Sequence, residues 1–133
     1  MSELYEGLEY PSRQFELTPE KITTYLEAVG ETSEMFRGTG LVPPMAAAAL
    51  AMTELSRSLT VPPGSVHVAQ ELDFRETIAA GETLTCRGRV SRKVDRGAMH
   101  LVAIDISVVG KELRPVITGR LTFVLPADQV ARQ

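Results

Sequence analysis

Few side chains in this sequence are suited to acid–base or nucleophilic chemistry, and they are widely spaced. The two histidines, His67 and His100, and the single cysteine, Cys86, share no short motif. Histidine is the usual acid or base near neutral pH, and cysteine becomes a nucleophile when its surroundings lower its pKa. We expect His67 to be a hydrogen-bonded structural residue, His100 to be exposed and Cys86 to be a small core residue.

Three further polar residues interrupt apolar patterns. Gln70 lies on the apolar face of a predicted strand, where it either satisfies buried backbone groups or touches a ligand. Asp105 breaks another apolar run, and we expect it to face outward. Glu54 falls late on an Ala-rich helix, beside Arg57, and we expect it at a solvated helix end.

Composition predicts one globular domain spanning residues 1–133, with 44% apolar residues and a net charge of −3. Nucleic acid binding normally needs a basic face, and we expect none here. We interpret the densest basic stretch as a solvated strand face; the alternative is contact with an anionic cofactor such as coenzyme A. That stretch contains Arg87, Arg89, Arg92, Lys93 and Arg96.

The location signals favour the cytoplasm. Cys86 alone forms no internal disulfide and has no partners at metal-ligand spacing, so we expect neither a metal nor a cofactor. The acidic segment Met1–Glu6 lacks the apolar core of a signal peptide. The most apolar stretch, Leu41–Met52, is shorter than the ~20 residues that cross a bilayer, so we expect no membrane contact.

A short helix is predicted to begin at Thr18. The Thr18 hydroxyl can accept from a free N–H of the first turn, and Pro19 suits that turn because it needs no N–H. Apolar residues then recur at helical spacing as far as Gly30, a natural stop. They are Ile22, Tyr25, Leu26 and Val29.

A second helix is predicted from Pro43–Pro44 to about Leu59. It is apolar on most of its circumference, which is typical of a buried helix. The four alanines 46–49 would let another element approach its backbone closely, as a strongly curved sheet requires.

After Gly64 the apolar residues alternate with polar ones, a pattern that predicts strands with one buried face. Short, turn-rich connections favour antiparallel neighbours. Phe15 and Leu17 could add an earlier strand. The alternating apolar positions are Val66, Val68, Leu72 and Phe74; Leu84, Cys86 and Val90; Val102, Ile104, Ile106 and Val108; and Ile117, Leu121, Phe123 and Leu125. This order predicts an α+β fold in which a curved antiparallel sheet wraps one Ala-rich helix, the hot-dog architecture.

Three segments, in order, resemble MaoC-like dehydratase domains, particularly the N-terminal half of the double hot-dog forms. The resemblance extends from about Tyr5 to Leu125 and implies binding of acyl chains on coenzyme A or an acyl carrier protein. Active members of that family hydrate trans-2-enoyl thioesters or dehydrate (R)-3-hydroxyacyl thioesters. The segments are Phe15–Thr18 with Tyr25–Gly30, then Leu41–Pro44, and Val66–Phe74 followed by Ala80–Leu84.

The resemblance also locates the catalytic positions, and this sequence departs from them. The family's Asp falls on Glu31, and its His, five residues later, falls on Phe36, which cannot transfer a proton. The backbone donor for the developing enolate falls on Pro44, which has no N–H. Met45 and Ala46 could still offer amides at the helix start. Phe36, Pro44, Met45, Ala46 and Gln70 are the expected substrate-binding residues.

Three hypotheses remain. The first is a non-catalytic subunit that binds acyl-CoA or acyl carrier protein and supports a catalytic hot-dog partner, as a homodimer or a heteromer. The second is an active hydratase, dehydratase or thioesterase using Glu31 or Glu54, since hot-dog thioesterases carry a carboxylate on the central helix. The third is a non-enzymatic acyl-CoA sensor.

Overall fold

The computed structural model describes residues 4–30, 42–57 and 63–126. In this part of the chain two α-helices and five strands follow one another, and a short 3-10 turn joins the last two strands. They are β1 (Arg13–Glu16), α1 (Pro19–Ala28), α2 (Pro44–Ser56), β2 (Val66–Phe74), β3 (Thr83–Arg96), β4 (Met99–Val109), η2 (Lys111–Leu113) and β5 (Pro115–Pro126).

Helix α1 begins as its sequence predicts. The Thr18 hydroxyl accepts from the Lys21 N–H at 3.2 Å, and the apolar stripe buries Ile22 and Leu26. Val29 was expected on that stripe but is 56% exposed. It follows the last helical turn, so helical spacing no longer determines where its side chain points.

Helix α2 is packed on one side and partly open on the other. Its buried residues are Ala46, Ala47, Ala48, Ala51 and Leu55. The prediction of burial nearly all round is wrong at Met45, which is 41% exposed, because neighbouring elements cover only part of the helix.

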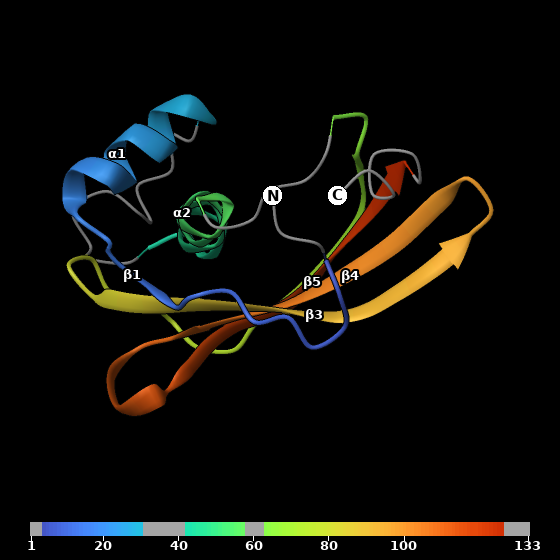
Figure 1. Ribbon diagram of the computed structural model, residues 1–133. Coiled ribbons are helices and arrows are strands. Elements are labelled where there is room, and N and C mark those ends of the chain that lie inside the picture. Colours follow the sequence, from blue (N-terminus) through green and yellow to red (C-terminus); the bar gives the residue numbers. More distant parts are fainter. Residues whose placement is uncertain (1–3, 31–41, 58–62, 127–133) are drawn as a thin grey trace.

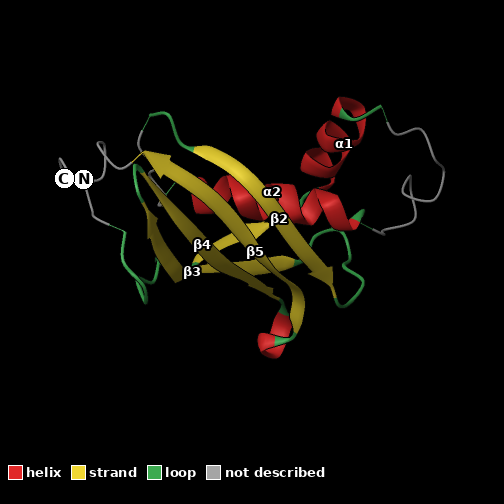
Figure 2. Ribbon diagram, turned by 90° about the vertical axis from the view of Figure 1, so that its right-hand side faces the viewer, coloured by secondary structure: helices red, strands yellow, loops and turns green. Residues whose placement is uncertain are grey.

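The strands form one antiparallel sheet in the order β1-β3-β4-β5-β2. Figure 1 looks along α2, which lies over one face of the curved sheet with α1 on the same side. Figure 2 shows the same arrangement after a quarter turn. The predicted α+β hot-dog architecture is confirmed.

Glycines allow two close approaches in this fold. A Cβ on Gly88 of β3 would lie 2.9 Å from Leu55 Cδ1, so the missing side chain lets α2 settle against the sheet. A Cβ on Gly119 of β5 would lie 2.5 Å from the Glu71 carbonyl oxygen, so β2 also depends on a glycine neighbour.

Strand β2 lies at one edge of the sheet and is mostly exposed. Its predicted buried face is therefore wrong for Val66, Val68 and Phe74, which are 55%, 51% and 38% exposed. The reason is the strand order, because α2 packs mainly on β1 and β3, at the far side of the sheet. The pairing with β5 also shifts register between His67 and Ala69, a β-bulge.

The opposite edge is covered by the N-terminal part of the chain. Strand β1 pairs with β3, and the preceding residues continue along it. The Gly7 N–H donates to the Val90 carbonyl at 2.8 Å, the Val90 N–H to Leu8 at 2.8 Å, and the Tyr10 N–H to Gly88 at 2.9 Å. The edge of β3 is thus occupied from Thr83 to Val90.

Candidate functional site

The start of α2 is fixed against the loop that joins β2 to β3. The Val42 N–H donates to the Ile78 carbonyl at 3.1 Å, and both side chains are buried. Pro43 then caps the helix and Pro44 occupies its first position, where a missing N–H costs no intrahelical bond. This anchoring holds the helix N-terminus at one end of the sheet.

The amides at this helix start differ in availability. The Ala46 N–H donates to the Pro43 carbonyl at 2.9 Å, so it is not the free amide that the sequence suggested. Pro44 has none. Within the described residues, the Met45 N–H has no hydrogen-bond partner. Of Pro44, Met45 and Ala46, Met45 is therefore the residue that can offer a backbone donor.

Gln70 lies on the side of β2 that faces the helices. It pairs with Leu121 of β5, which is buried, and it shares its face with Leu72 and Phe74. Gln70 itself is exposed. No hydrogen bond from its side chain to a buried backbone group is found among the described residues, and its contact with the thioester stays a prediction.

Neither histidine behaves as expected. His67 is exposed and makes no hydrogen bond with the described residues; its ring stacks on Phe123 at a centroid distance of 4.7 Å. His100 is 15% exposed rather than open, because the β3–β4 hairpin sets it opposite Asp95, whose carboxylate contacts Nδ1. Both partners come from cross-strand register.

Glu54 and Cys86 are not arranged as a catalytic pair. Glu54 forms an ion pair with Arg57 at 3.1 Å and lies roughly 14 Å along α2 from Met45, at about 1.5 Å per residue. Cys86 is in the core as predicted, and burial, with a smaller contribution from the Glu54 charge, raises its pKa to about 11. A protonated, buried thiol is a poor nucleophile.

Two predicted site residues, Glu31 and Phe36, lie outside the described residues. Their assignment to the catalytic positions stays a prediction. Among residues 4–30, 42–57 and 63–126 no group of three or more His, Cys, Asp or Glu side chains could hold a metal ion. In the same ranges no helix has the length and apolar character needed to cross a membrane.

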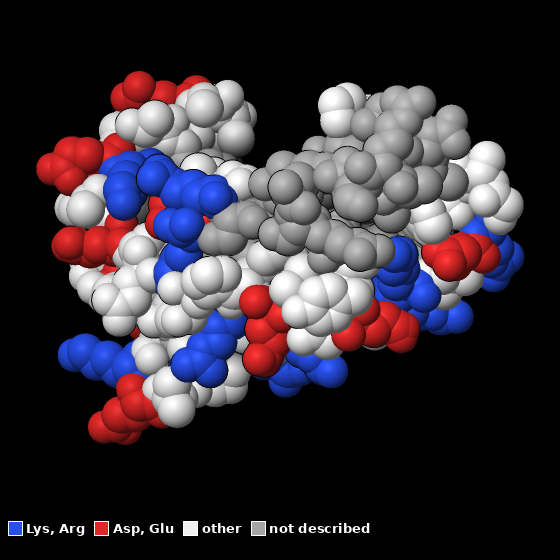
Figure 3. All heavy atoms as spheres, viewed as in Figure 1, with Lys and Arg blue, Asp and Glu red and all other residues white. Residues whose placement is uncertain are grey.

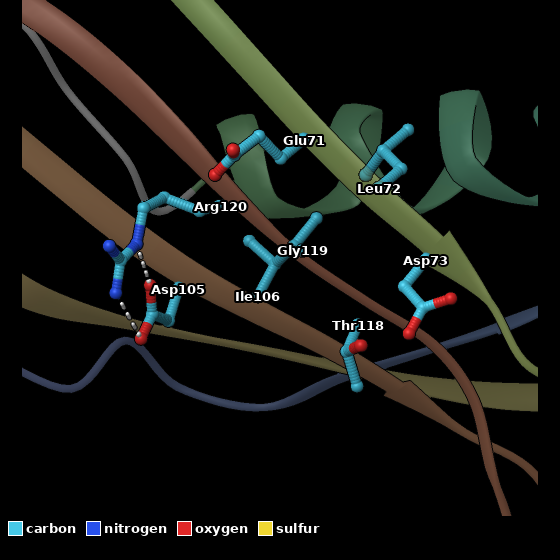
Figure 4. Close-up of a pocket in the computed structure, with 8 residues that line it drawn as sticks. All are labelled: Glu71, Leu72, Asp73, Asp105, Ile106, Thr118, Gly119 and Arg120. Carbon is cyan, nitrogen blue, oxygen red and sulfur yellow. Dashed lines mark hydrogen bonds and ion pairs between the residues drawn. The ribbon is translucent and has the colours of Figure 1, made fainter.

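The outer face of the sheet, away from the helices, carries a row of alternating charges. Each residue of the row is the cross-strand partner of the next. From one edge of the sheet to the other they are Glu9 beside β3, Arg89 of β3, Asp105 of β4, Arg120 of β5 and Glu71 of β2. The central contact is drawn in Figure 4, where Arg120 Nε donates to Asp105 Oδ1 at 2.8 Å. In the view of Figure 3, acidic and basic side chains are likewise interspersed.

Asp105 is the centre of this row. It also accepts from the Ser91 hydroxyl at 3.0 Å, and the Arg120 hydrogen bond, followed by the Ser91 bond, lowers its pKa against the opposing effect of burial. The expectation that Asp105 faces outward is confirmed. The row was missed in the sequence because it joins strands whose register only the fold defines.

An open cavity of about 410 Å³ lies beside Asp105 on this outer face. It is separate from the start of α2, and two of its four charged residues, Asp105 and Arg120, form an ion pair with each other. The lining residues are Glu71, Leu72, Asp73, Asp105, Ile106, Thr118, Gly119 and Arg120.

Comparison with known proteins decides the family. The family model described as FAS1-like, dehydratase domain region, matches residues 5–118. The chain belongs to this family of FAS1-like dehydratase domains. A search of curated proteins finds no match. The predicted membership of a hot-dog dehydratase family is thus confirmed, whereas the non-catalytic subtype stays a prediction.

Solved structures place this dehydratase domain in the same fold. It is similar to the (R)-hydratase from A. caviae involved in PHA biosynthesis, with 16% identity, TM-score 0.76, and coverage of 92% of this chain and 98% of that one. It is also similar to the MaoC-like dehydratase from Rhodospirillum rubrum, with 17% identity, TM-score 0.72, and coverage of 92% of this chain and 93% of that one. A third similar structure is the C-terminally truncated HadBC (3R-hydroxyacyl-ACP dehydratase) complex from Mycobacterium tuberculosis, with 19% identity, TM-score 0.69, and coverage of 90% of this chain and 96% of that one.

Proposed function

We propose that this dehydratase-family domain binds acyl thioesters, is catalytically silent alone, and supports a catalytic hot-dog partner. The observation that carries the proposal is the uneven cover of the sheet. Helix α2 packs mainly on β1 and β3, whereas Gln70, Leu72 and Phe74 on the same face of β2 keep part of their surface exposed. Such a strip, open at a sheet edge, suits an acyl tail and closes when a second chain adds to β2.

Catalytic silence is supported by the groups at the start of α2. Pro44 cannot donate at the family's oxyanion position, and the Ala46 N–H is already engaged by Pro43. In the sequence, Phe36 stands where the family's proton-transferring His is expected. Glu31 alone, with one methylene more than Asp, would have to act as both acid and base.

A hot-dog partner is supported by one of the structural neighbours. The HadBC structure is, by its name, a complex. β2 is an edge strand with exposed apolar side chains, and no other described strand pairs with its outer edge, so it is the surface on which another sheet would pair. The single buried thiol of Cys86 supports a reducing compartment, and we place the chain in the cytoplasm.

The decisive catalytic experiment uses the purified full chain with crotonyl-CoA. We expect no hydration above the rate without protein. Turnover at ordinary enzyme rates that Glu31→Ala abolishes would contradict catalytic silence and establish Glu31 as the working carboxylate.

The binding surface is tested with a fluorescent acyl-CoA and a matched pair of variants. Gln70→Glu adds a charge on the helix-facing side of the sheet, whereas Thr122→Glu adds one on the outer side, opposite Ala69 and Ala103. We expect Gln70→Glu to weaken binding at least tenfold and Thr122→Glu to leave it unchanged. Equal effects, or no binding by the unmodified chain, would overturn the proposed site.

A further inference from the structure

The free edge of β2 differs in charge between its two faces. After the bulge, the strand is regular from Ala69 to Phe74. Leu72 points to the helix side, whereas Glu71 and Asp73 project from the outer side (Figure 4). Gln70 and Phe74 share the face of Leu72, because side chains alternate along the strand. Any strand that pairs with this regular segment meets both carboxylates.

Neighbouring cations compensate these carboxylates unequally. Arg75 forms an ion pair with Asp73 at 3.1 Å. Arg120 is the cross-strand neighbour of Glu71, but its guanidinium donates to Asp105. In the described part of the chain no hydrogen bond or ion pair reaches the Glu71 carboxylate. The outer side of the edge is therefore acidic, and Glu71, whose charge interacts with Arg120 without a direct contact, is less compensated than Asp73.

Pairing with a second copy of this chain would oppose like charges. Two copies related by a two-fold axis pair their β2 strands antiparallel, and each residue must face one on the same side of the sheet. Two registers keep most of the regular segment paired. In the first register, centred on Glu71, this residue lies opposite Glu71 of the second copy. In the other register, centred on Leu72, Glu71 of each copy lies opposite Asp73 of the other copy. Like charges directly opposite each other destabilise a strand pair.

We propose that β2 selects a different hot-dog chain, whose facing strand carries Lys or Arg on its outer side, over a second copy of itself. The inference rests on the proposed function in one respect, that the occupant of this edge is a hot-dog chain. Charge complementarity gives the partner its chemistry near Glu71 and Asp73. Toward the start of β2 the exposed Val66 and Val68 require an apolar stretch on the same partner.

Self-association of the purified full chain, measured by sedimentation equilibrium, tests the charge argument. Glu71→Gln with Asp73→Asn removes both charges and keeps the side-chain shape. Its control, Glu27→Gln with Glu112→Gln, makes the same change in net charge at exposed positions away from β2. We expect the first pair to strengthen self-association at least tenfold, the control to change it less than twofold, and high salt to narrow the difference.

A charge-swapped form of the same chain supplies a basic edge as a probe. Glu71→Lys with Asp73→Lys, mixed with the unmodified chain, should form heterodimers in preference to either homodimer. A stable homodimer of the unmodified chain whose dissociation constant responds neither to Glu71→Gln with Asp73→Asn nor to salt would overturn the inference. Failure of the acyl-CoA titration, with charge-dependent pairing intact, would instead overturn the proposed function and leave this edge assignment standing.

Discussion

Arg120 and Asp105 face each other across β5 and β4, with the guanidinium Nε 2.8 Å from the carboxylate. Both side chains are about half exposed, so the pair is screened by water, yet it sits where cross-strand neighbours continue the alternation of charge. The pair contributes mainly by fixing the register of β4 and β5. A shift of the strands by one residue would turn one of the two charges toward the core.

Replacing Asp105 by Asn should lower stability slightly and only where the carboxylate is ionised. The Arg120 bond holds the folded-state pKa of Asp105 below its ordinary value. The stabilisation is therefore present above the ordinary Asp pKa of ~3.9 and is lost as pH falls through the lower folded-state pKa. We expect the melting temperature to fall by roughly 1–3 °C at neutral pH.

Thermal unfolding of the unmodified chain and of Asp105→Asn from pH 7 down to pH 2 checks this. The amide oxygen of the new side chain can still accept the Ser91 hydroxyl bond, so the substitution isolates the charge. If the melting temperature of Asp105→Asn stayed below that of the unmodified chain by the same amount at every pH, packing and not ionisation would cause the difference in stability.

Replacing Gly119 by Ala should disrupt the attachment of β2. The new methyl group would lie 2.5 Å from the Glu71 carbonyl oxygen, and because that oxygen belongs to the backbone, no side-chain rotation can relieve the contact. We expect a loss of about 3 kcal/mol in the free energy of unfolding, measured in urea.

The matched control is Gly97→Ala in the β3–β4 turn. Nothing lies within 4 Å of a Cβ there, but φ is +59°. Only the conformational cost of about 1 kcal/mol applies. Similar losses for Gly119→Ala and Gly97→Ala would mean that β2 moves freely away from β5.

Replacing one alanine of α2 by a larger residue should measure how closely the helix packs against the sheet. Ala47 is fully buried, whereas its near neighbour Ala49 is only partly covered. We expect Ala47→Leu to cost about 2–3 kcal/mol in urea unfolding and Ala49→Leu less than about 1 kcal/mol. The reverse order would place the wrong face of α2 against the sheet.

Removing the hydroxyl of Tyr10 should cost little at neutral pH. This oxygen is buried and has no partner in the described part of the chain, so Tyr10→Phe loses no hydrogen bond. We expect unfolding free energies within about 0.5 kcal/mol of each other, with Tyr5→Phe as the exposed control.

Alkaline pH should separate Tyr10→Phe from the unmodified chain. Burial raises the pKa of Tyr10 from 10.0 to about 12. The folded state therefore holds its proton longer, and the resulting stability is complete below pH 10 and lost as pH rises toward 12. Urea unfolding across this interval should show a shallower decline for Tyr10→Phe. Cys86 adds a decline of the same sign to both proteins, so identical slopes would contradict the burial of this hydroxyl.

Local signals made most of the fold predictable. Thr18 and Pro19 define the start of α1 through the first turn alone, and alternation of apolar residues identifies each strand through its own sequence. The Ala-rich composition of α2 indicates close contact with a sheet. Each of these signals operates within a few neighbouring residues.

The predictions that were wrong concern features that depend on which strands become neighbours. The alternation in β2 predicts a buried face, but the order of strands puts it at an edge, so Phe74 is partly exposed. The contacts of His67 with Phe123 and of His100 with Asp95 likewise follow from register. At the site, the sequence located Gln70 on the correct face but not the engagement of the Ala46 amide, because that amide bonds within a turn whose shape two prolines determine.

The N-terminal segment that lies along β3 also restricts where a further strand can add to this sheet. With Gly7, Leu8 and Tyr10 hydrogen-bonded beside Gly88 and Val90, an incoming strand finds no template there. Growth of the sheet is thereby directed toward β2, because the β3 edge from Thr83 to Val90 is already paired within the chain.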